Sequence, residues 1–398
     1  MRKSLVVLAL VAMVAMIAAT SFAASVPLPV ILTADDNYNS GANSASAFHL
    51  NTTTGAMTFL KQLKTGGTGL GGGYFANPGT AISSNGHCVF VTNTDSDTVS
   101  WFESPAYNLG GSAGIPGMFS TYGEGGGVAL APNGKLLATA DSGLFEVSTW
   151  SVAANCALTH IADYTPSIGG DYFSPLAFTP SGTGLVVPAP DYEGAEIFTV
   201  NSNGTLTDVN NVTWSSLANC ANGCYPTGLD FTKDSKVVVF GSASVGQDAV
   251  LSANIGSGGL SNAQVWLVSN AAGVTNPNVP WFSQAGYAGK GELYQAFSGY
   301  GSSYPSGEVT LAFTESPLSI TVEGNGTSIP APDGYLGAVR SYGATGTGTG
   351  GGELVFAVFP NILQPAKIGA GGAITLQNTT TDANGVGLLS ISIFPATR

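Results

Sequence analysis

The stretch Val128-Ala-Leu-Ala-Pro-Asn-Gly134, followed by Leu136-Leu-Ala-Thr-Ala-Asp141, indicates the fold of this chain. It consists of a short apolar strand, a tight turn with proline and glycine, and a second apolar strand, which is the pattern of a β-hairpin. The same pattern returns in Gly79–Asn93, Leu176–Val187 and Leu229–Phe240. Equivalent turn positions in the four copies are separated by 48, 48 and 53 residues. A repeat of this length, built from short strands, predicts units that stack against copies of themselves.

A second motif repeats with the same period. It contains a turn glycine, any residue, an aliphatic residue or methionine, and a hydroxyl residue, and it occurs at Gly55–Thr58, Gly204–Thr207, Gly258–Ser261 and Gly372–Thr375. Cys156–Thr159 fits the same frame with cysteine in the glycine position. A period near 50 residues with four short strands per unit is typical of a propeller blade. We therefore predict an all-β, seven-bladed β-propeller with four-stranded antiparallel blades.

The two chain ends are predicted to close the ring. We place the blades at residues 28–68, 76–124, 125–170, 171–222, 223–274, 275–332 and 333–385. The first blade lacks its innermost strand, whereas Leu388–Phe394 is left over after the seventh blade. Pairing of the N- and C-terminal strands would complete the first blade and remove two open sheet edges. Residues 24–398 are thus predicted to form a single domain.

Residues 1–23 have the features of a signal peptide. Arg2 and Lys3 precede an apolar run from Leu5 to Ala19, and Ser21-Phe22-Ala23 resembles a cleavage site. The alternative is an uncleaved anchor helix. Cleavage would release a secreted, periplasmic or cell-surface protein with no membrane insertion, because no second apolar run is long enough to span a bilayer.

Composition restricts the possible partners. The chain has a net charge of −13, which becomes −15 without Arg2 and Lys3, and only 9% of its residues are charged. Nucleic acids and anionic membrane surfaces require a basic surface that this chain cannot assemble. The 55 glycines fit a fold with many tight turns.

Four cysteines in an oxidising compartment are expected to form disulfides. Cys220 and Cys224 would close a short loop, which leaves Cys88 to pair with Cys156. In a four-stranded blade both of these residues fall beside turns on the same face, in neighbouring blades. Intermolecular pairing is the alternative for Cys88 and Cys156, and zinc binding is the alternative for the Cys220–Cys224 motif, although it supplies only two ligands.

The second predicted blade carries the clearest family signal. Phe90-Val-Thr-Asn93, followed by Asp97-Thr-Val-Ser-Trp-Phe102, resembles the YVTN-repeat, lactonase-like family of seven-bladed propellers. The resemblance implies the fold and raises lactone hydrolysis as an expected activity. Lactonase-like members look to use histidine, arginine and glutamate in the central funnel. Here Arg340 is the only interior arginine, and the residues before the prolines at the first-strand entrances are Asn77, Ser174, Tyr225 and Asn276, none of them histidine. No catalytic residue can be transferred, and the catalytic residues remain unknown.

Polar and aromatic residues cluster where the fold would place a ligand face. Second strands end in carboxylates, and their turns share one face with the entrances to the first strands. The ligand-face candidates are Asn77, Asp95, Asp97, Asp141, Asp171, Tyr172, Asp191, Tyr225, Asn276 and Trp281. Such a rim suits neutral sugars or a hard cation such as Ca²⁺. A solvated surface that keeps the protein soluble is the alternative, and no cofactor or metal-ligating residue is predicted.

Three other motif matches are not supported by the predicted structure around them. Gly67–Gly72 and Gly346–Gly351 match the dinucleotide-binding pattern G-x-G-x-x-G, but neither lies in a βαβ unit. Ser112 matches a nucleophile elbow but is predicted to lie in a loop. The three histidines, His49, His87 and His160, show no metal-ligand spacing.

The preferred interpretation is an exported, monomeric binding or interaction module for a protein, a glycan or a small neutral ligand of unknown identity. The alternative is a lactonase-like hydrolase, with a 6-phosphogluconolactonase-type fold, acting on a neutral lactone. In that case Asp171 and Asp230 are candidates for activating the water. The sequence leaves open whether the protein is an enzyme.

Overall fold

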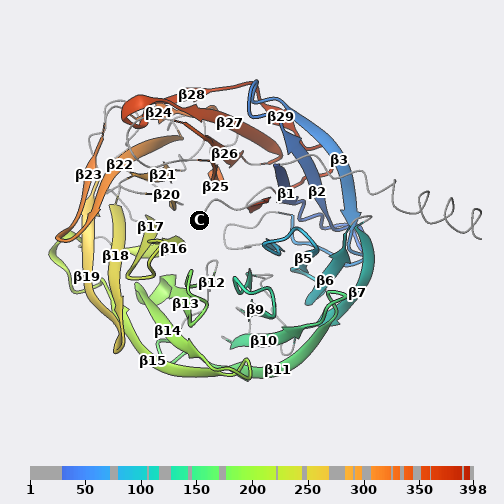
Figure 1. The fold of residues 1–398 in the computed structure, drawn as a ribbon, viewed down its shortest axis with the longest axis horizontal. Coiled ribbons are helices and arrows are strands. Elements are labelled where there is room, and N and C mark those ends of the chain that lie inside the picture. Colours follow the sequence, from blue (N-terminus) through green and yellow to red (C-terminus); the bar gives the residue numbers. More distant parts are fainter. Residues whose placement is uncertain are drawn as a thin grey trace, which may run out of the picture.

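The structure is a computed structural model in which seven four-stranded sheets stand side by side around a central axis (Figure 1). It describes residues 29–71, 79–104, 107–115, 127–141, 146–169, 176–220, 223–243, 249–268, 283–289, 292–297, 306–323, 326–331, 336–343, 351–358, 360–387 and 390–394. The predicted signal peptide lies outside these residues. No helix among them is long and apolar enough to cross a membrane.

The blades follow one another along the chain, each from an innermost to an outermost strand. Blade one contains β30 (Ile391–Phe394), β1 (Val30–Ala34), β2 (Ser44–Leu50) and β3 (Met57–Lys64). Blade two contains β4 (Thr80–Ile82), β5 (Cys88–Asn93), β6 (Thr98–Glu103) and β7 (Asn108–Gly114). Blade three contains β8 (Val128–Leu130), β9 (Leu136–Asp141), β10 (Glu146–Val152) and β11 (Leu158–Tyr164). Blade four contains β12 (Ala177–Phe178), β13 (Gly184–Ala189), β14 (Gly194–Val200) and β15 (Leu206–Thr213).

The remaining three blades are built in the same way. Blade five contains β16 (Tyr225–Phe231), β17 (Val237–Ala243), β18 (Ala249–Gly256) and β19 (Gly259–Leu267). Blade six contains β20 (Ser283–Gly289), β21 (Glu292–Phe297), β22 (Gly307–Glu315) and β23 (Leu318–Val322), with β24 (Thr327–Ser328) added to β22. Blade seven contains β25 (Leu336–Tyr342), β26 (Glu353–Val358), β27 (Ile362–Ile368) and β28 (Ile374–Leu376), with β29 (Thr380–Thr381) added to β27. The described residues include the short 3₁₀ turns η1 (Pro190–Tyr192), η2 (Ala218–Cys220) and η4 (Ala370–Gly372). All seven predicted blades are confirmed, within the predicted boundaries.

The strand positions explain the apolar runs of the repeat. Every residue of the second strands β5, β9 and β13 is buried, because both faces of these strands pack against the neighbouring blades. The outermost strands are largely exposed to solvent, as in β15, where Leu206 is the one buried residue. The prediction that Ser112 lies in a loop was wrong. Ser112 lies on the outermost strand β7 and pairs with Ser100.

The two chain ends close the ring as predicted. Strand β30 pairs antiparallel with β1, which places Ile31 opposite Ile393 and Val30 opposite Phe394. Ile391 and Ile393 pack into a core shared with residues of blade seven, such as Val355. The C-terminal strand therefore completes blade one and also fills the space between the first and last blades.

Both predicted disulfides are present. Cys88 lies at the start of β5 and Cys156 in the turn between β10 and β11, and their Cα atoms are 5.5 Å apart. This bond joins blades two and three and closes a loop with a sequence separation of 68, whereas the Cys220–Cys224 separation is 4. In the chain-entropy model the long loop contributes about 4 kcal/mol and the short one about 2 kcal/mol to the free energy of unfolding.

Candidate functional site

The candidate site lies on the face that carries the turns from second to third strands, here called the acidic face. These turns follow β1, β5, β9 and β13 in the first four blades. Of the predicted ligand-face residues, the structure describes Asp95, Asp97, Asp141, Asp191 and Tyr225. Asn77, Asp171, Tyr172, Asn276 and Trp281 lie outside the described residues, as does much of each connection that enters a first strand.

Three of the predicted carboxylates interact with one another. Asp95 is exposed and Asp97 half-buried in the turn after β5, and Asp141 is buried at the end of β9 in the next blade. Partial burial of Asp97, together with the negative charges of Asp141 and Asp95, raises its pKa to about 6. Because the three carboxylates repel one another, the site would favour a ligand that donates hydrogen bonds to their oxygens or carries a positive charge.

A glycine-rich segment, Thr65–Gly71, holds the first two turns of this face together. The carbonyl of Thr68 accepts the N–H of Asp95 at 3.0 Å, and the N–H of Gly69 reaches the turn of blade one. A Cβ at Gly69 would come within 2.5 Å of the backbone of Asp36, so a side chain cannot be accommodated there. This packing explains Gly67 and Gly69 of the G-x-G-x-x-G match, which lie in a segment that bridges two blades.

Two further carboxylates, which follow the second strand of blade one, turn inward. Asp36 is fully buried, and its Oδ1 accepts the N–H of Leu70 and the hydroxyl of Thr94, each at 2.9 Å. Asp35 is also fully buried and forms a hydrogen bond with Asp382 of blade seven. Both residues stabilise the junctions between blades and are not available to a ligand.

Two exposed tyrosines add aromatic surface to the acidic face. Tyr38 follows β1 and is 60% exposed, and Tyr192 follows β13 and is 54% exposed. Each ring packs over a glycine of a connection between blades, Gly71 for Tyr38 and Gly169 for Tyr192, at positions where a Cβ would come within 2.6 and 3.3 Å of the ring. Contact with rigid backbone on one side leaves the other side of each ring open to solvent. Sequence reasoning missed both tyrosines, although Tyr192 directly follows Asp191 and Tyr38 lies two residues after Asp36.

The other described candidates lie further around the ring. Asp191 is exposed in η1, and the adjacent Glu193 accepts the N–H of Cys224 at 3.1 Å. Tyr225 is half-buried at the start of β16, and its ring packs closely against Gly223 in the disulfide loop. The structure thus brings Asp191 and Tyr192 together, and it ties Tyr225 to the disulfide loop.

Sequence reasoning also missed buried glutamates between the blades. Glu196 accepts the hydroxyl of Ser167 at 2.9 Å and the N–H of Ile168 at 2.8 Å, and burial raises its pKa. Burial raises the pKa of Glu308 to about 8, so it is largely neutral at pH 7. The repeat gives no signal for Glu196, because the equivalent position in blade three, 48 residues earlier, is Ser148.

No histidine supports chemistry on the acidic face. His87 lies in the turn before β5, His49 near the end of β2, and His160 near the start of the outermost strand β11. All three are on the side of the ring opposite the acidic face. Asp230, the other suggested base, is half-buried near the end of β16, where its Oδ1 accepts the N–H of Phe231 at 2.8 Å. Histidine-dependent catalysis on this face is therefore excluded.

Calcium binding stays an untested prediction. The described residues contain one group of three or more histidine, cysteine or carboxylate side chains whose ligand atoms all lie within 4.8 Å of one another, and it lies on the opposite face. Carboxylate oxygens that bind one Ca²⁺ ion each lie about 2.4 Å from it, so any two of them are at most about 4.8 Å apart. The described part of the acidic face holds an open arrangement of acceptors rather than a closed cation cage.

The fold and this face define a seven-bladed β-propeller with carboxylates and aromatic rings on one side. Solved structures with the same architecture include a candidate 6-phosphogluconolactonase from Bacteroides fragilis, with a TM-score of 0.66 and 16% identity over 92% of this chain and 98% of that one. A candidate 6-phosphogluconolactonase from Bacteroides uniformis gives a TM-score of 0.67 and 14% identity over 92% and 99%. A protein from Lactobacillus plantarum gives 0.65 and 14% over 92% and 99%.

These similarities establish the fold and confirm the predicted resemblance to lactonase-like seven-bladed propellers at the level of architecture. No family model matches the chain. No curated protein matches it either.

Proposed function

We propose that this protein is an exported binding module that recognises a neutral, hydroxyl-rich ligand, a glycan, through its acidic face. The observation that carries the proposal is the combination of the exposed rings of Tyr38 and Tyr192 with the carboxylates of Asp97 and Asp191 on one side of the ring. Aromatic faces pack against the C–H surfaces of sugars, and carboxylate oxygens accept hydrogen bonds from sugar hydroxyls. A net charge of −13 disfavours acidic ligands.

Tyr38→Ala and Tyr192→Ala are each expected to weaken binding of a neutral oligosaccharide roughly tenfold, because each removes one stacking platform. The oligosaccharide is chosen by screening a glycan array with the purified protein, and affinities are measured by calorimetry. Phe59→Ala is the matched control, because Phe59 is 49% exposed on the outermost strand β3, away from the acidic face. Affinity independent of salt supports a neutral glycan. Strongly salt-dependent binding of a basic protein, or no binding to any glycan on the array, would contradict the proposal.

Hydrolysis of a neutral lactone is the second candidate, and one observation favours it. Asp97 has a pKa of about 6, close to the range in which a general base works near neutral pH. The fold is shared with candidate lactonases, although identities of 14–16% carry no activity across. In this alternative Asp97 accepts a proton from water that attacks the lactone carbonyl.

Asp97→Asn is expected to lower lactone turnover at least a hundredfold, because an amide cannot accept the proton. The wild-type rate should rise as the pH increases through about 6, where Asp97 loses its proton. Gluconolactone and acyl-homoserine lactones are suitable substrates, with Asp208→Asn, which removes an exposed carboxylate on the outermost strand β15, as the control. The absence of turnover in the wild-type protein, or full activity of Asp97→Asn, would exclude this mechanism.

A further inference from the structure

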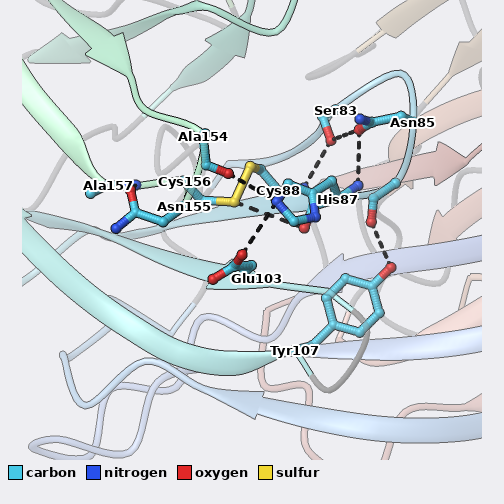
Figure 2. Close-up of a disulfide and its surroundings, with 11 residues drawn as sticks. Ser83, Asn85, His87, Cys88, Glu103, Tyr107, Ala154, Asn155, Cys156 and Ala157 are labelled. Carbon is cyan, nitrogen blue, oxygen red and sulfur yellow. Dashed lines mark hydrogen bonds and ion pairs between the residues drawn. A yellow bond between two sulfur atoms is a disulfide. The ribbon is translucent and has the colours of Figure 1, made fainter. Parts of the chain in front are cut away.

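The Cys88–Cys156 disulfide lies beside two further side chains that can bind a metal ion, on the face opposite the acidic face (Figure 2). His87 precedes Cys88, and one of its ring nitrogens and the two sulfur atoms all lie within 4.8 Å of one another. Glu103, opposite Cys88 on strand β6, places its Oε1 atom 3.4 Å from Nε2 of His87. Blades two and three thus bring together two sulfurs, one imidazole and one carboxylate.

These are the ligand types that zinc prefers. Zinc sites in proteins are tetrahedral and use cysteine, histidine and carboxylate ligands. Nitrogen and oxygen ligands about 2.1 Å from a tetrahedral zinc stand roughly 3.4 Å apart, which is the separation of His87 Nε2 and Glu103 Oε1. Both of these side chains are partly exposed, at 36% and 47%, so an ion has a path from solvent. Cys88 and Cys156, which carry the sulfurs, are both buried.

The turn that carries His87 is ordered by its own hydrogen bonds. Asn85 Oδ1 accepts the N–H of His87 at 3.0 Å and the hydroxyl of Ser83 at 2.7 Å, and Ser83 in turn accepts the N–H of Cys88 at 2.9 Å. His87 Nε2 lies 3.0 Å from the carbonyl of Ala154, in the turn that leads to Cys156, and a zinc ion bound to this nitrogen would replace that contact. None of these contacts uses the disulfide, so the imidazole stays beside the sulfurs when the bond is broken.

We propose that reduction of this disulfide by a thiol or phosphine reductant creates a zinc site formed by Cys88, Cys156 and His87, with Glu103 as the fourth ligand. Two electrons from the reductant and two protons convert the disulfide to two thiols. Zinc then replaces both thiol protons, which pass to solvent, and links blades two and three in place of the covalent bond. A low-molecular-weight disulfide takes up two electrons from the two thiolates and is cleaved to two thiols, which reforms the Cys88–Cys156 bond and releases the ion. The proposal is independent of the ligand-binding function, because it concerns the other face.

The second disulfide provides an internal contrast. Cys220 and Cys224 have no histidine beside them, because the three histidines lie in other blades. Substitution of both by serine removes their thiols from the measurement and leaves one cysteine pair in an otherwise full-length chain. His160 is a matched control for His87: it has the same 36% exposure and a carboxylate partner, Asp163, at 2.8 Å, but it is not part of the group of ligand atoms around the two sulfurs.

The test is a zinc titration of the Cys220→Ser/Cys224→Ser protein, reduced with a phosphine and kept under nitrogen, in competition with a coloured chelator. We expect one zinc per chain in the reduced form and none in the oxidised form. His87→Ala should weaken binding at least tenfold, whereas His160→Ala should leave it unchanged. Co²⁺ should give the visible absorption of a tetrahedral site together with a sulfur charge-transfer band.

Three results would overturn the proposal. These are no zinc bound by the reduced protein, equal affinity in the His87→Ala variant, or loss of the β-sheet circular dichroism signal on reduction in the presence of zinc. The last result would mean that zinc cannot replace the disulfide in joining the two blades.

Discussion

Deletion of residues 390–398 is expected to abolish cooperative folding at room temperature. The deletion removes Ile391 and Ile393, which are 1% and 6% exposed in the core between blades one and seven. Loss of each buried isoleucine costs about 3 kcal/mol, and the loss of strand pairing to β1 adds to this. The total is comparable with the 5–15 kcal/mol that stabilises a typical domain. The remaining chain would also expose the apolar edge of β1.

Ile393→Ala tests the same contact without removing the strand. We expect it to lower the free energy of unfolding by about 3 kcal/mol in urea titrations followed by circular dichroism. Ile374→Ala is the control, because Ile374 is half-buried on the outermost strand of blade seven, and we expect it to cost about 1 kcal/mol. If the deletion variant unfolds cooperatively at nearly the wild-type urea concentration, closure by the C-terminal strand does not hold the ring together.

The repeat predicted the fold because each blade meets the same packing requirement. A second strand such as Leu136–Asp141 is buried on both faces, so it must be apolar in every copy, and a tight turn must precede it. The pairing of Cys88 with Cys156 was predicted from cysteine spacing together with blade geometry, and the pairing of the two terminal strands from the blade count. These features depend on periodic, local patterns, which one sequence displays directly.

The candidate site was less predictable because it depends on which way individual side chains turn. Asp35, Asp36 and Asp97 occupy similar turns, yet the first two are fully buried and the third is half-exposed. That difference arises from contacts with residues distant in sequence, such as Asp382 and Leu70. Tyr38 and Tyr192 form platforms only because glycines of other connections pack beneath their rings.

The seam between the first and last blades contains two buried carboxyl groups. Asp35 and Asp382 are both fully buried and form a hydrogen bond with each other, and the hydroxyl of Thr33 lies 3.0 Å from one and 2.7 Å from the other. The hydroxyl of Ser46 also donates to Asp35. Two carboxylates cannot share a hydrogen bond without a proton. Burial, followed by the charge of Asp382, raises the pKa of Asp35 to about 7.

This raised pKa makes the closure of the ring sensitive to pH. A group with a higher pKa in the folded state holds its proton more tightly there, so its contribution to stability is complete below about pH 4. The contribution is lost as the pH rises through about 7. The rise from 3.8 to about 7 corresponds to roughly 4 kcal/mol in the free energy of unfolding. We therefore expect the wild-type protein to be less stable at pH 8.5 than at pH 5.

Asp35→Asn should remove most of this dependence, because the amide can donate to Asp382 without carrying a charge. At pH 8.5 the variant is expected to exceed the wild type in free energy of unfolding by about 2 kcal/mol, and at pH 5 to equal it or fall slightly below. Urea titrations at both pH values measure the difference. The difference between the free energies of unfolding of the two proteins does not contain the contribution of Glu308, because both proteins carry it. The raised pKa of Glu308, about 8, lowers stability at high pH in the same way as that of Asp35. Asp191→Asn, an exposed carboxylate, should follow the wild type at both pH values. Two results would show that the pair does not share a proton in the folded ring. One is a wild-type protein that becomes more stable between pH 5 and 8.5, and the other is an Asp35→Asn variant with a lower free energy of unfolding than the wild type at pH 8.5.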